Sequence, residues 1–473
     1  MKITGIKNER PFYYFEEISK IPRGSGNERK IAEYIEDLAK KRGLYCLRDE
    51  ANNVFIKKSA SVGRENESAV ILQAHTDMVC EKNIGKVHDF ENDAIELIQK
   101  GNILRANNTT LGADDGFGVA IMLAILEDDS ISRPPLEFLF TSSEEIGLVG
   151  ANKFDYSQVD AKEMINLDSA EENTVIIGCC GGMRTELELP VKYQKTDTPS
   201  HKITIKGLVG GHSGEDIDRG RLNAHVLMGK VLSSIKSEVD FTVSYISGGD
   251  KDNAIPRECE AVISANQDLT AAFENARKLA LGEVKAKEDA SLTVTLEQFE
   301  CDKTLTKEDT ENLLEILSLP NAVLSYRATP PIMPSISRNL ARIRTEDSKI
   351  KVGFSSRAYT ACDIQKSTNE LDTLANKIGA STYHHEGYPS WQDDATSPLV
   401  LKYQSAYNEA TGRKTEPTLI HAGLECGVIT SRVKGLSAIS VGANVRDLHT
   451  PKEEMEIDSM DRIYDTVIKF LSK

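Results

Sequence analysis

The sequence lacks the features that mark membrane, secreted and nucleic-acid-binding proteins. No stretch approaches the ~18 consecutive apolar residues of a membrane span, and the start, Met1-Lys2-Ile3-Thr4-Gly5, has no apolar signal-peptide core. Basic residues are outnumbered, because 57 Lys and Arg against 73 Asp and Glu give a net charge of −16. Nucleic acids and anionic membranes attract basic surfaces, so we expect neither as a partner.

Cysteine is also sparse, and no two cysteines have the CxxC spacing. The 473 residues contain eight cysteines, spread along the whole chain. Disulfide frameworks belong to short secreted chains, so we expect free thiols and a cytoplasmic location. A hydrophobic content of 40% and a charged content of 27% are ordinary for a folded protein and exclude a disordered chain. At ~150 residues per domain, the length corresponds to two or three domains.

The first part of the chain alternates short apolar runs with helical patterns. Runs at 69–74, 136–141 and 164–167 are typical of buried strands, and 116–128 has the pattern of a helix. An earlier helix is predicted over 25–40, with Ser25-x-x-Glu28 as a capping box at its start. Strand–helix–strand alternation predicts an α/β layer.

From about residue 186 to 389 the strands are longer and more alternating, in a β-α-β-β-α-β order with intervening helices. This order predicts an antiparallel sheet with helices on one face. After Pro389 the α/β character returns. We therefore expect the α/β fold class, with a discontinuous catalytic domain (1–186 and 390–473) built on a mostly parallel sheet flanked by helices. An α+β domain (187–389) is inserted as a lid or dimerisation domain.

Histidines and carboxylates follow the predicted strands, where the crevice sites of parallel sheets form. They are His75, the Glu144-Glu145 pair, Asp168, His449 and, at the opening of the 116–128 helix, Asp114. Each has an ordinary structural explanation when taken alone. Together they indicate a metal site, whose mixed nitrogen and oxygen ligands suit Zn²⁺, or Mn²⁺ and Co²⁺. Asp77 could accept the second N–H of the His75 imidazole and fix its tautomer.

The strings around these residues resemble a known family. They are His75-Thr-Asp77, Gly112-Ala-Asp-Asp-Gly116, Glu144-Glu145-x-Gly147 and Asn166-Leu-Asp168. Their order and spacing are similar to those of the co-catalytic zinc peptidases, which include glutamate carboxypeptidase, aminoacylase, tripeptidase and cytosolic dipeptidases. The strings 72–79, 211–214 and 421–427 resemble the aminoacyl-histidine dipeptidase branch more specifically. The resemblance covers essentially the whole chain.

The resemblance implies a role for each matched residue and two divalent ions per chain. Asp114 would bridge the ions and have a cis bond to Asp115, His75 and Asp168 would complete one site, and Glu145 and His449 would complete the other. Glu144 would be the general base and Asp77 the partner of His75. His212, in the inserted domain, would stabilise the oxyanion, acting within its own chain or on a partner subunit.

Recognition of the substrate termini needs further groups. Asn253 and Arg357 are candidates for the substrate carboxylate, because Arg offers a bidentate fork, although Arg357 could equally be a surface residue after a strand. His421 and Glu425 belong to the 421–427 string. Glu425 could receive the substrate ammonium, with a structural salt bridge as the alternative.

The leading hypothesis is a dinuclear metallodipeptidase for small peptides such as Xaa-His, acting as a possible homodimer. The alternative is an N-acyl amino acid amidohydrolase on the same scaffold. A non-catalytic relative is disfavoured, because all seven chemical positions are present, from His75 to His449.

Overall fold

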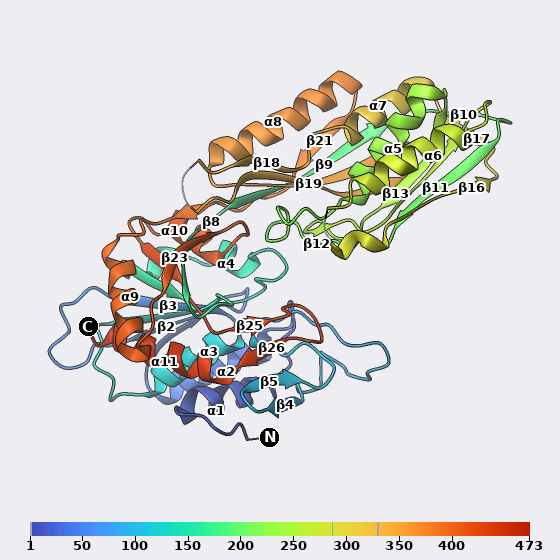
Figure 1. Ribbon diagram of the computed structural model, residues 1–473. Coiled ribbons are helices and arrows are strands. Elements are labelled where there is room, and N and C mark those ends of the chain that lie inside the picture. The colour runs from blue at the N-terminus through green and yellow to red at the C-terminus, as the bar shows by residue number, and fades with distance from the viewer. Residues whose placement is uncertain (1, 286, 329–330) are drawn as a thin grey trace. The chain divides into compact units, whose positions relative to one another are not determined.

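The computed structural model describes residues 2–285, 287–328 and 331–473 (Figure 1). The chain forms two compact units. Unit 1 comprises the chain up to Cys179 together with 391–419 and 424–473, and unit 2 comprises 180–390 and 420–423. Unit 2 is thus inserted in the sequence between parts of unit 1. The domain boundaries expected from the sequence stay predictions.

Unit 1 is built on a nine-stranded mixed sheet. Its strands are β1 (Tyr45–Arg48), β2 (Val54–Lys58), β3 (Val70–His75), β6 (Leu136–Thr141), β7 (Glu163–Asn166), β8 (Thr174–Cys179), β22 (Trp391–Gln392), β23 (Glu416–Ile420) and β24 (Ser437–Ser440). A small sheet contains β4 (Leu97–Lys100), β5 (Ile103–Ala106), β25 (Val445–Arg446) and β26 (Glu454–Glu456). The helices are α1 (Glu9–Ile18), α2 (Arg29–Lys41), α3 (Ala113–Glu127), α4 (Val149–Lys153), α9 (Pro398–Thr411), α10 (Glu425–Arg432) and α11 (Ile457–Leu471).

The centre of the main sheet is parallel, in the order β6-β3-β7-β24, and antiparallel strands form its margins. His75 at the end of β3 lies opposite Thr141 at the end of β6, and Gln73 lies opposite Asn166 at the end of β7. Buried apolar strands of this kind need both faces covered, which explains the near-continuous apolar runs. The register brings the carboxyl ends of three strands to one edge.

The capping box predicted at Ser25-x-x-Glu28 is wrong. Helix α2 begins at Arg29, and its N-cap residue, Glu28, makes no side-chain hydrogen bond to the helix. The Oγ of Ser25 donates instead to Asp77, and the Glu28 carboxylate accepts from Ser143. Both side chains therefore make long-range contacts, and Glu28 also accepts the main-chain N–H of Gly26, so neither caps the helix.

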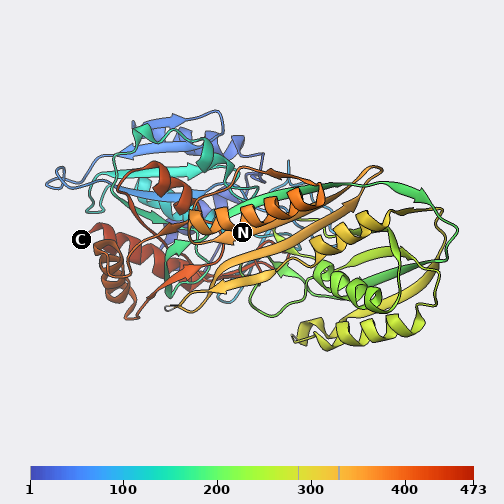
Figure 2. The same cartoon turned by 90° about the horizontal axis from the view of Figure 1, so that it is seen from above.

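Unit 2 contains a nine-stranded antiparallel sheet. Its strands are β9 (Gly181–Pro190), β11 (Ser200–Lys206), β13 (Thr242–Gly248), β15 (Cys259–Ser264), β16 (Thr293–Phe299), β18 (Ala322–Tyr326), β19 (Pro334–Thr345), β20 (Lys349–Ala358) and β21 (Ser381–His384), and short pairs are formed by β10 (Tyr193–Lys195) with β17 (Lys303–Leu305) and by β12 (Gly211–His212) with β14 (Ala254–Ile255). The helices α5 (Ala224–Glu238), α6 (Thr270–Gly282), α7 (Lys307–Leu317) and α8 (Ala361–Ile378) lie together on one side of this sheet (Figure 2). One apolar core joins these helices to the sheet. The predicted fold class is confirmed.

A buried histidine in unit 2 gives a pH-dependent prediction. His225 on α5 is 0% exposed, its Nδ1 lies 3.1 Å from the carbonyl oxygen of Leu340, and burial lowers its pKa to about 4. The unfolded chain binds this proton near pH 6.5, so the free energy of unfolding falls as pH drops from about 6.5 to about 4. We expect a loss of about 3 kcal/mol from this residue alone. Urea unfolding followed by circular dichroism at pH 7, 5.5 and 4 measures it.

The variant His225→Asn keeps a polar group near the Nδ1 position but does not titrate in this range, so this part of the pH dependence should disappear. The exposed His385 provides the matched control, because His385→Asn should leave the slope unchanged. An identical slope in His225→Asn and the unmodified chain would contradict the assignment.

Candidate metal centre

The predicted metal ligands lie at the carboxyl ends of the central parallel strands of unit 1 and in segments beside them. His75 ends β3, the Glu144-Glu145 pair follows β6, and Asp168 follows β7. Asp114 lies at the start of α3, where the backbone is not yet helical. His449 comes from the loop between β25 and β26. Segments far apart in the sequence therefore converge at one edge of the sheet.

Asp114 lies between two pairs of side chains. Its Oδ1 is 2.9 Å from Nε2 of His75, and that nitrogen is 3.6 Å from Oδ1 of Asp168. Its Oδ2 is 3.1 Å from Nε2 of His449, and that nitrogen is 3.0 Å from Oε1 of Glu145. The peptide bond from Asp114 to Asp115 is cis. One carboxylate thus offers one oxygen to each pair, as a bridging ligand would.

The donor set fits divalent cations. Ligand atoms of His75, Asp114 and Glu145 lie within 4.8 Å of one another, and so do those of His75, Asp115 and Asp168. Two imidazoles among several carboxylates form a mixed nitrogen and oxygen set that suits Zn²⁺, Mn²⁺ or Co²⁺.

The buried carboxylates of the cluster also favour a nearby positive charge. Burial and the charge of Asp114 raise the pKa of Glu145 to about 7, and burial raises the pKa of Asp168 to about 6. Although burial opposes it, hydrogen bonds to Asp114 and Glu145 raise the pKa of His449 to about 11. The cluster therefore binds protons more tightly than isolated side chains would, because a proton reduces the repulsion between the acids. A bound dication would reduce the same repulsion.

The Asp77 carboxylate connects His75 to the Glu144-Glu145 loop. Its Oδ1 is 3.4 Å from Nδ1 of His75 and accepts the main-chain N–H of Glu144 at 3.0 Å. Its Oδ2 accepts the main-chain N–H of Glu145 at 3.2 Å. A carboxylate in this position orients the imidazole and the loop together.

Two residues near the cluster make contacts that the sequence reasoning did not predict. Glu453, with 2% of its surface exposed, accepts the main-chain N–H groups of residues 111–114. Its only sequence signal is its position four residues after His449. Asp115, assigned only the cis bond, accepts the main-chain N–H of His75 at 3.3 Å. Both side chains hold the backbone of ligand-bearing loops.

The remaining predicted residues, except Glu425, lie in unit 2 and form a second polar cluster there. Nη2 of Arg357 is 3.3 Å from Nε2 of His212, and its Nη1 donates to the Tyr388 hydroxyl at 2.6 Å. The side chain of Arg357 is buried, which excludes the alternative of a surface residue. The carbonyl oxygen of Asn253, an exposed residue, accepts the N–H of Ser213 beside His212.

His421 packs against the same cluster. It is 4% exposed, its Nε2 is 2.7 Å from the Oγ of Ser337, and burial together with the charge of Arg357 lowers its pKa to about 3. A Cβ on Gly214 would lie only 2.3 Å from the His421 carbonyl oxygen, so glycine is required there. His212, Asn253, Arg357 and His421 are thus neighbours in unit 2.

Glu425 lies in unit 1 as the first residue of α10, and it is 0% exposed. It accepts hydrogen bonds from Nε2 of Gln73 and Oγ1 of Thr141, both at 2.6 Å. Burial raises its pKa to about 7. Because these two partners are neutral, neither forms the salt bridge considered as the alternative.

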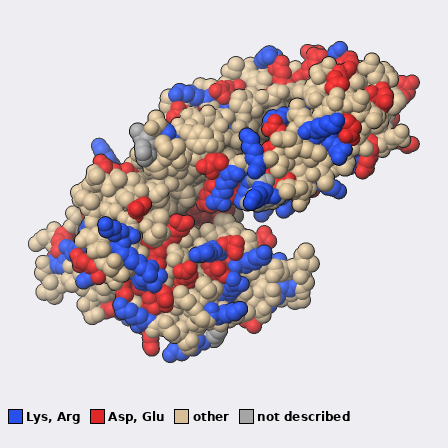
Figure 3. All heavy atoms as spheres, viewed as in Figure 1, with Lys and Arg blue, Asp and Glu red and all other residues tan. Residues whose placement is uncertain are grey.

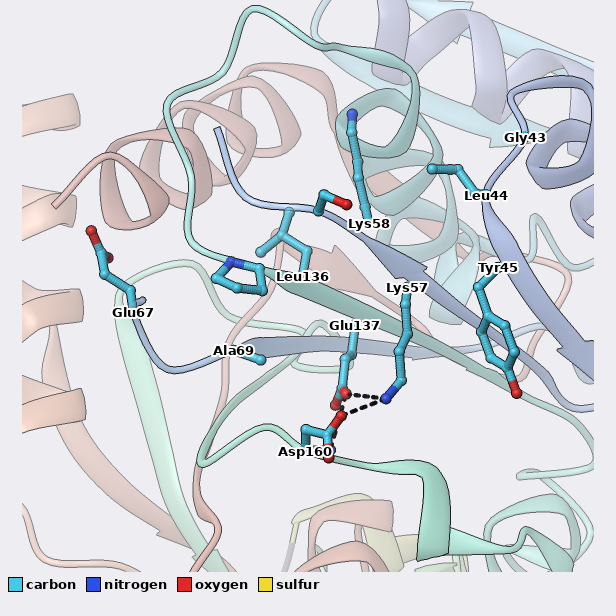
Figure 4. A pocket seen from close by; sticks show the side chains of 12 residues that line it. Gly43, Leu44, Tyr45, Lys57, Lys58, Glu67, Ala69, Leu136, Glu137 and Asp160 are labelled. Atoms are coloured by element: carbon cyan, nitrogen blue, oxygen red, sulfur yellow. Dashed lines mark hydrogen bonds and ion pairs between the residues drawn. The ribbon is translucent and has the colours of Figure 1, made fainter. Parts of the chain in front are cut away.

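A cavity of about 480 Å³ in unit 1 lies away from this edge (Figure 4). It is lined by residues at the starts of β3 and β6, so it lies at the opposite end of the sheet. Its Lys57 pairs with Asp160 at 2.6 Å and with Glu137 at 3.3 Å. The charge of Lys57 is therefore already paired with carboxylates of the same cavity. On the face drawn in Figure 3, acidic and basic side chains are interspersed over both units.

Comparison with known proteins identifies the family. Residues 71–473 match the model of peptidase family M20/M25/M40. The chain belongs to this family. It is therefore a metallopeptidase. Among the described residues, no helix has the length and apolarity to cross a bilayer.

Individual members of the M20 family are similar over the full length. The cytosol non-specific dipeptidase of Escherichia coli is 33% identical over 466 residues, which cover 97% of this chain and 96% of that protein. The aminoacylhistidine dipeptidase of Vibrio alginolyticus matches with a TM-score of 0.85 and 32% identity, covering 100% and 98% of the two chains. An M20 metallo-carboxypeptidase of Sulfolobus solfataricus shares the fold, with a TM-score of 0.58, 15% identity and coverage of 98% and 99%.

Proposed function

We propose that the chain is a cytoplasmic dipeptidase that uses two divalent metal ions, with Zn²⁺ suiting the ligands best and Mn²⁺ or Co²⁺ as alternatives. The observation that carries the proposal is the position of Asp114, whose two oxygens face His75 and His449 separately. His75 and Asp168 would hold one ion, Glu145 and His449 the other. When bound, the ions would acidify a water molecule and polarise the scissile carbonyl.

Glu144 is proposed as the general base and then the general acid. Burial and the neighbouring charge of Glu145 raise its pKa well above the usual value. A raised pKa favours a group that takes a proton from water and delivers it to the leaving amine. Asp77 would keep His75 in the required tautomer while fixing the main chain of this loop.

The polar cluster of unit 2 is proposed to recognise substrate. Arg357, with Asn253 and His421 beside it, would bind the substrate carboxylate, and His212 would donate to the oxyanion. Glu425 is retained as the candidate for the substrate ammonium, because its Oε1 has no hydrogen-bond partner among the described residues. His212 can act on a partner's site only if the chain forms a homodimer. Analytical ultracentrifugation would detect that dimer.

The names of the two similar proteins, a cytosol non-specific dipeptidase and an aminoacylhistidine dipeptidase, favour small peptides that include Xaa-His. The competing activity is hydrolysis of N-acyl amino acids. The two differ at the amine end, because a free ammonium needs an acidic partner whereas an acyl group needs an apolar pocket.

A substrate panel separates the two activities. We expect hydrolysis of Xaa-His and Xaa-Gly dipeptides in the presence of Zn²⁺, Mn²⁺ or Co²⁺, and at least a tenfold lower kcat/KM for the N-acetylated forms and for tripeptides. Cleavage of only the acetylated compounds would replace the dipeptidase proposal with the amidohydrolase.

A further inference from the structure

The hexapeptide Arg23-Gly-Ser-Gly-Asn-Glu28, called here the 23–28 segment, contains none of the proposed metal ligands but contacts the loops that carry them. Arg23 is 3% exposed. Its Nη1 donates to the carbonyl oxygens of Thr76 and Asp77, both at 3.0 Å, and its Nη2 donates to that of Gly112. One guanidinium therefore joins the loop after β3, which follows His75, to the loop that leads into Asp114.

The two glycines of the Gly112–Gly116 string leave room for this guanidinium. A Cβ on Gly112 would lie 2.7 Å from Nη2 of Arg23, and a Cβ on Gly116 would lie 2.5 Å from the same nitrogen. Atoms that close cannot coexist, so side chains at these positions would displace Arg23. The close approach of Arg23 thus gives a physical reason for glycine at both positions, on either side of Asp114.

The other polar side chains of the segment reach the loop after β6. The Oγ of Ser25 donates at 2.7 Å to Oδ2 of Asp77, the carboxylate that also accepts the N–H of Glu144. Oε1 of Glu28 accepts from the N–H and the hydroxyl of Ser143, at 3.0 and 2.7 Å. The segment therefore contacts the loop after His75, the loop that leads into Asp114 and the loop that carries the Glu144-Glu145 pair.

A lysine cannot replace Arg23 in this position. Its ammonium would carry the same charge toward the surrounding acids, which include Glu453 and Asp77. A single nitrogen on a flexible stem cannot, however, hold carbonyl groups on two loops in one plane as the guanidinium fork does. Glu453 accepts the main-chain N–H groups of the Asp114 loop, and Arg23 is the group that joins this loop to the loop after β3.

We propose that Arg23 is a positioning residue of the metal centre, and that the 23–28 segment holds the loop after His75 and the loop before Asp114 in place relative to each other. The inference rests on the proposed function only in requiring that the centre binds divalent ions. Residues that orient metal ligands typically change metal affinity by 10- to 100-fold when substituted.

The test is a titration of the metal-free protein with Co²⁺, followed by visible absorption. We expect Arg23→Lys to weaken Co²⁺ binding by about 10- to 100-fold, with excess Co²⁺ restoring the wild-type absorption band. Ser25→Ala and Gly116→Ala should weaken binding in the same direction. Gly116→Ala is informative because it leaves Arg23 in the sequence and adds a methyl group whose nearest neighbour is the Arg23 guanidinium at 2.5 Å, with the Phe15 ring next at 3.3 Å.

Arg133→Lys is the matched control. Arg133 is also buried in unit 1, 6% exposed, and donates to the carbonyl oxygen of Ile131, but it precedes β6 at the far end of that strand. Its substitution should lower the melting temperature without changing Co²⁺ affinity. Unchanged affinity in Arg23→Lys and Gly116→Ala, with melting shifts like that of the control, overturns the inference.

Two further outcomes are informative. If Arg23→Lys does not fold, Ser25→Ala and Gly116→Ala decide by the same criterion. A wild-type chain that takes up no Co²⁺ would instead overturn the proposed function, and with it this inference.

Discussion

The variant Glu144→Gln is expected to keep its bound metal and to lose about 10²- to 10⁴-fold in kcat, the range that a positioned general base contributes. The amide is nearly isosteric with the carboxyl group and cannot take a proton from water. Because Glu144 is not among the proposed ligands, the metal content measured by elemental analysis should be unchanged. Steady-state kinetics on a dipeptide measures the loss in turnover.

Glu171→Gln provides the control for this variant, because Glu171 is an exposed carboxylate of the same unit. Its kcat should equal that of the unmodified chain. If Glu144→Gln retained most of its turnover, Glu144 would not be the base. If it lost metal as well as turnover, the separation between base and ligand proposed for the Glu144-Glu145 pair would be wrong.

The second large effect is expected for Asp114→Asn. The carboxylate has one oxygen 2.9 Å from His75 and the other 3.1 Å from His449, whereas an amide presents only one oxygen. Losing a shared ligand weakens both ion sites together, so we expect loss of both ions on desalting and turnover at least 10²-fold lower. Elemental analysis of the desalted protein and its dipeptidase activity measure the two quantities.

Asp37→Asn, at an exposed position on α2, should leave both quantities unchanged. An Asp114→Asn protein that retained one tightly bound ion together with near-normal turnover would indicate a mononuclear enzyme. The bridging role of Asp114 would then be wrong.

The fold was predictable wherever apolar patterns are simple. The run at 136–141 corresponds to β6, which the structure bounds at the same residues. The long strand β19 was not predicted, because polar residues such as Arg338 and Asn339 are buried within it and interrupt the apolar alternation. These buried groups have hydrogen-bond partners distant in the sequence. Arg338, for example, donates to the carbonyl oxygen of Ser367.

The part of the candidate site that consists of ligand side chains could be predicted from the sequence. The proposed ligands occupy distinctive strings, and the structure brings His75, Asp114, Glu145, Asp168 and His449 together. Arg23 and Glu453 were missed because they act on main-chain carbonyl and N–H groups, which no pattern of side chains records. Ser25 and Glu28 satisfied a local capping rule, but Ser25 donates to Asp77 and Glu28 accepts from Ser143, 52 and 115 residues away.

The central claim is that two ions in this centre support dipeptide hydrolysis, and a metal titration of activity tests it most directly. The metal-free protein is titrated with Zn²⁺, Mn²⁺ or Co²⁺ while Xaa-His hydrolysis and bound metal are measured in the same samples. The account predicts no turnover without metal and activity that rises until about two ions are bound per chain. Full activity with one ion, or hydrolysis that is indifferent to metal, would contradict it.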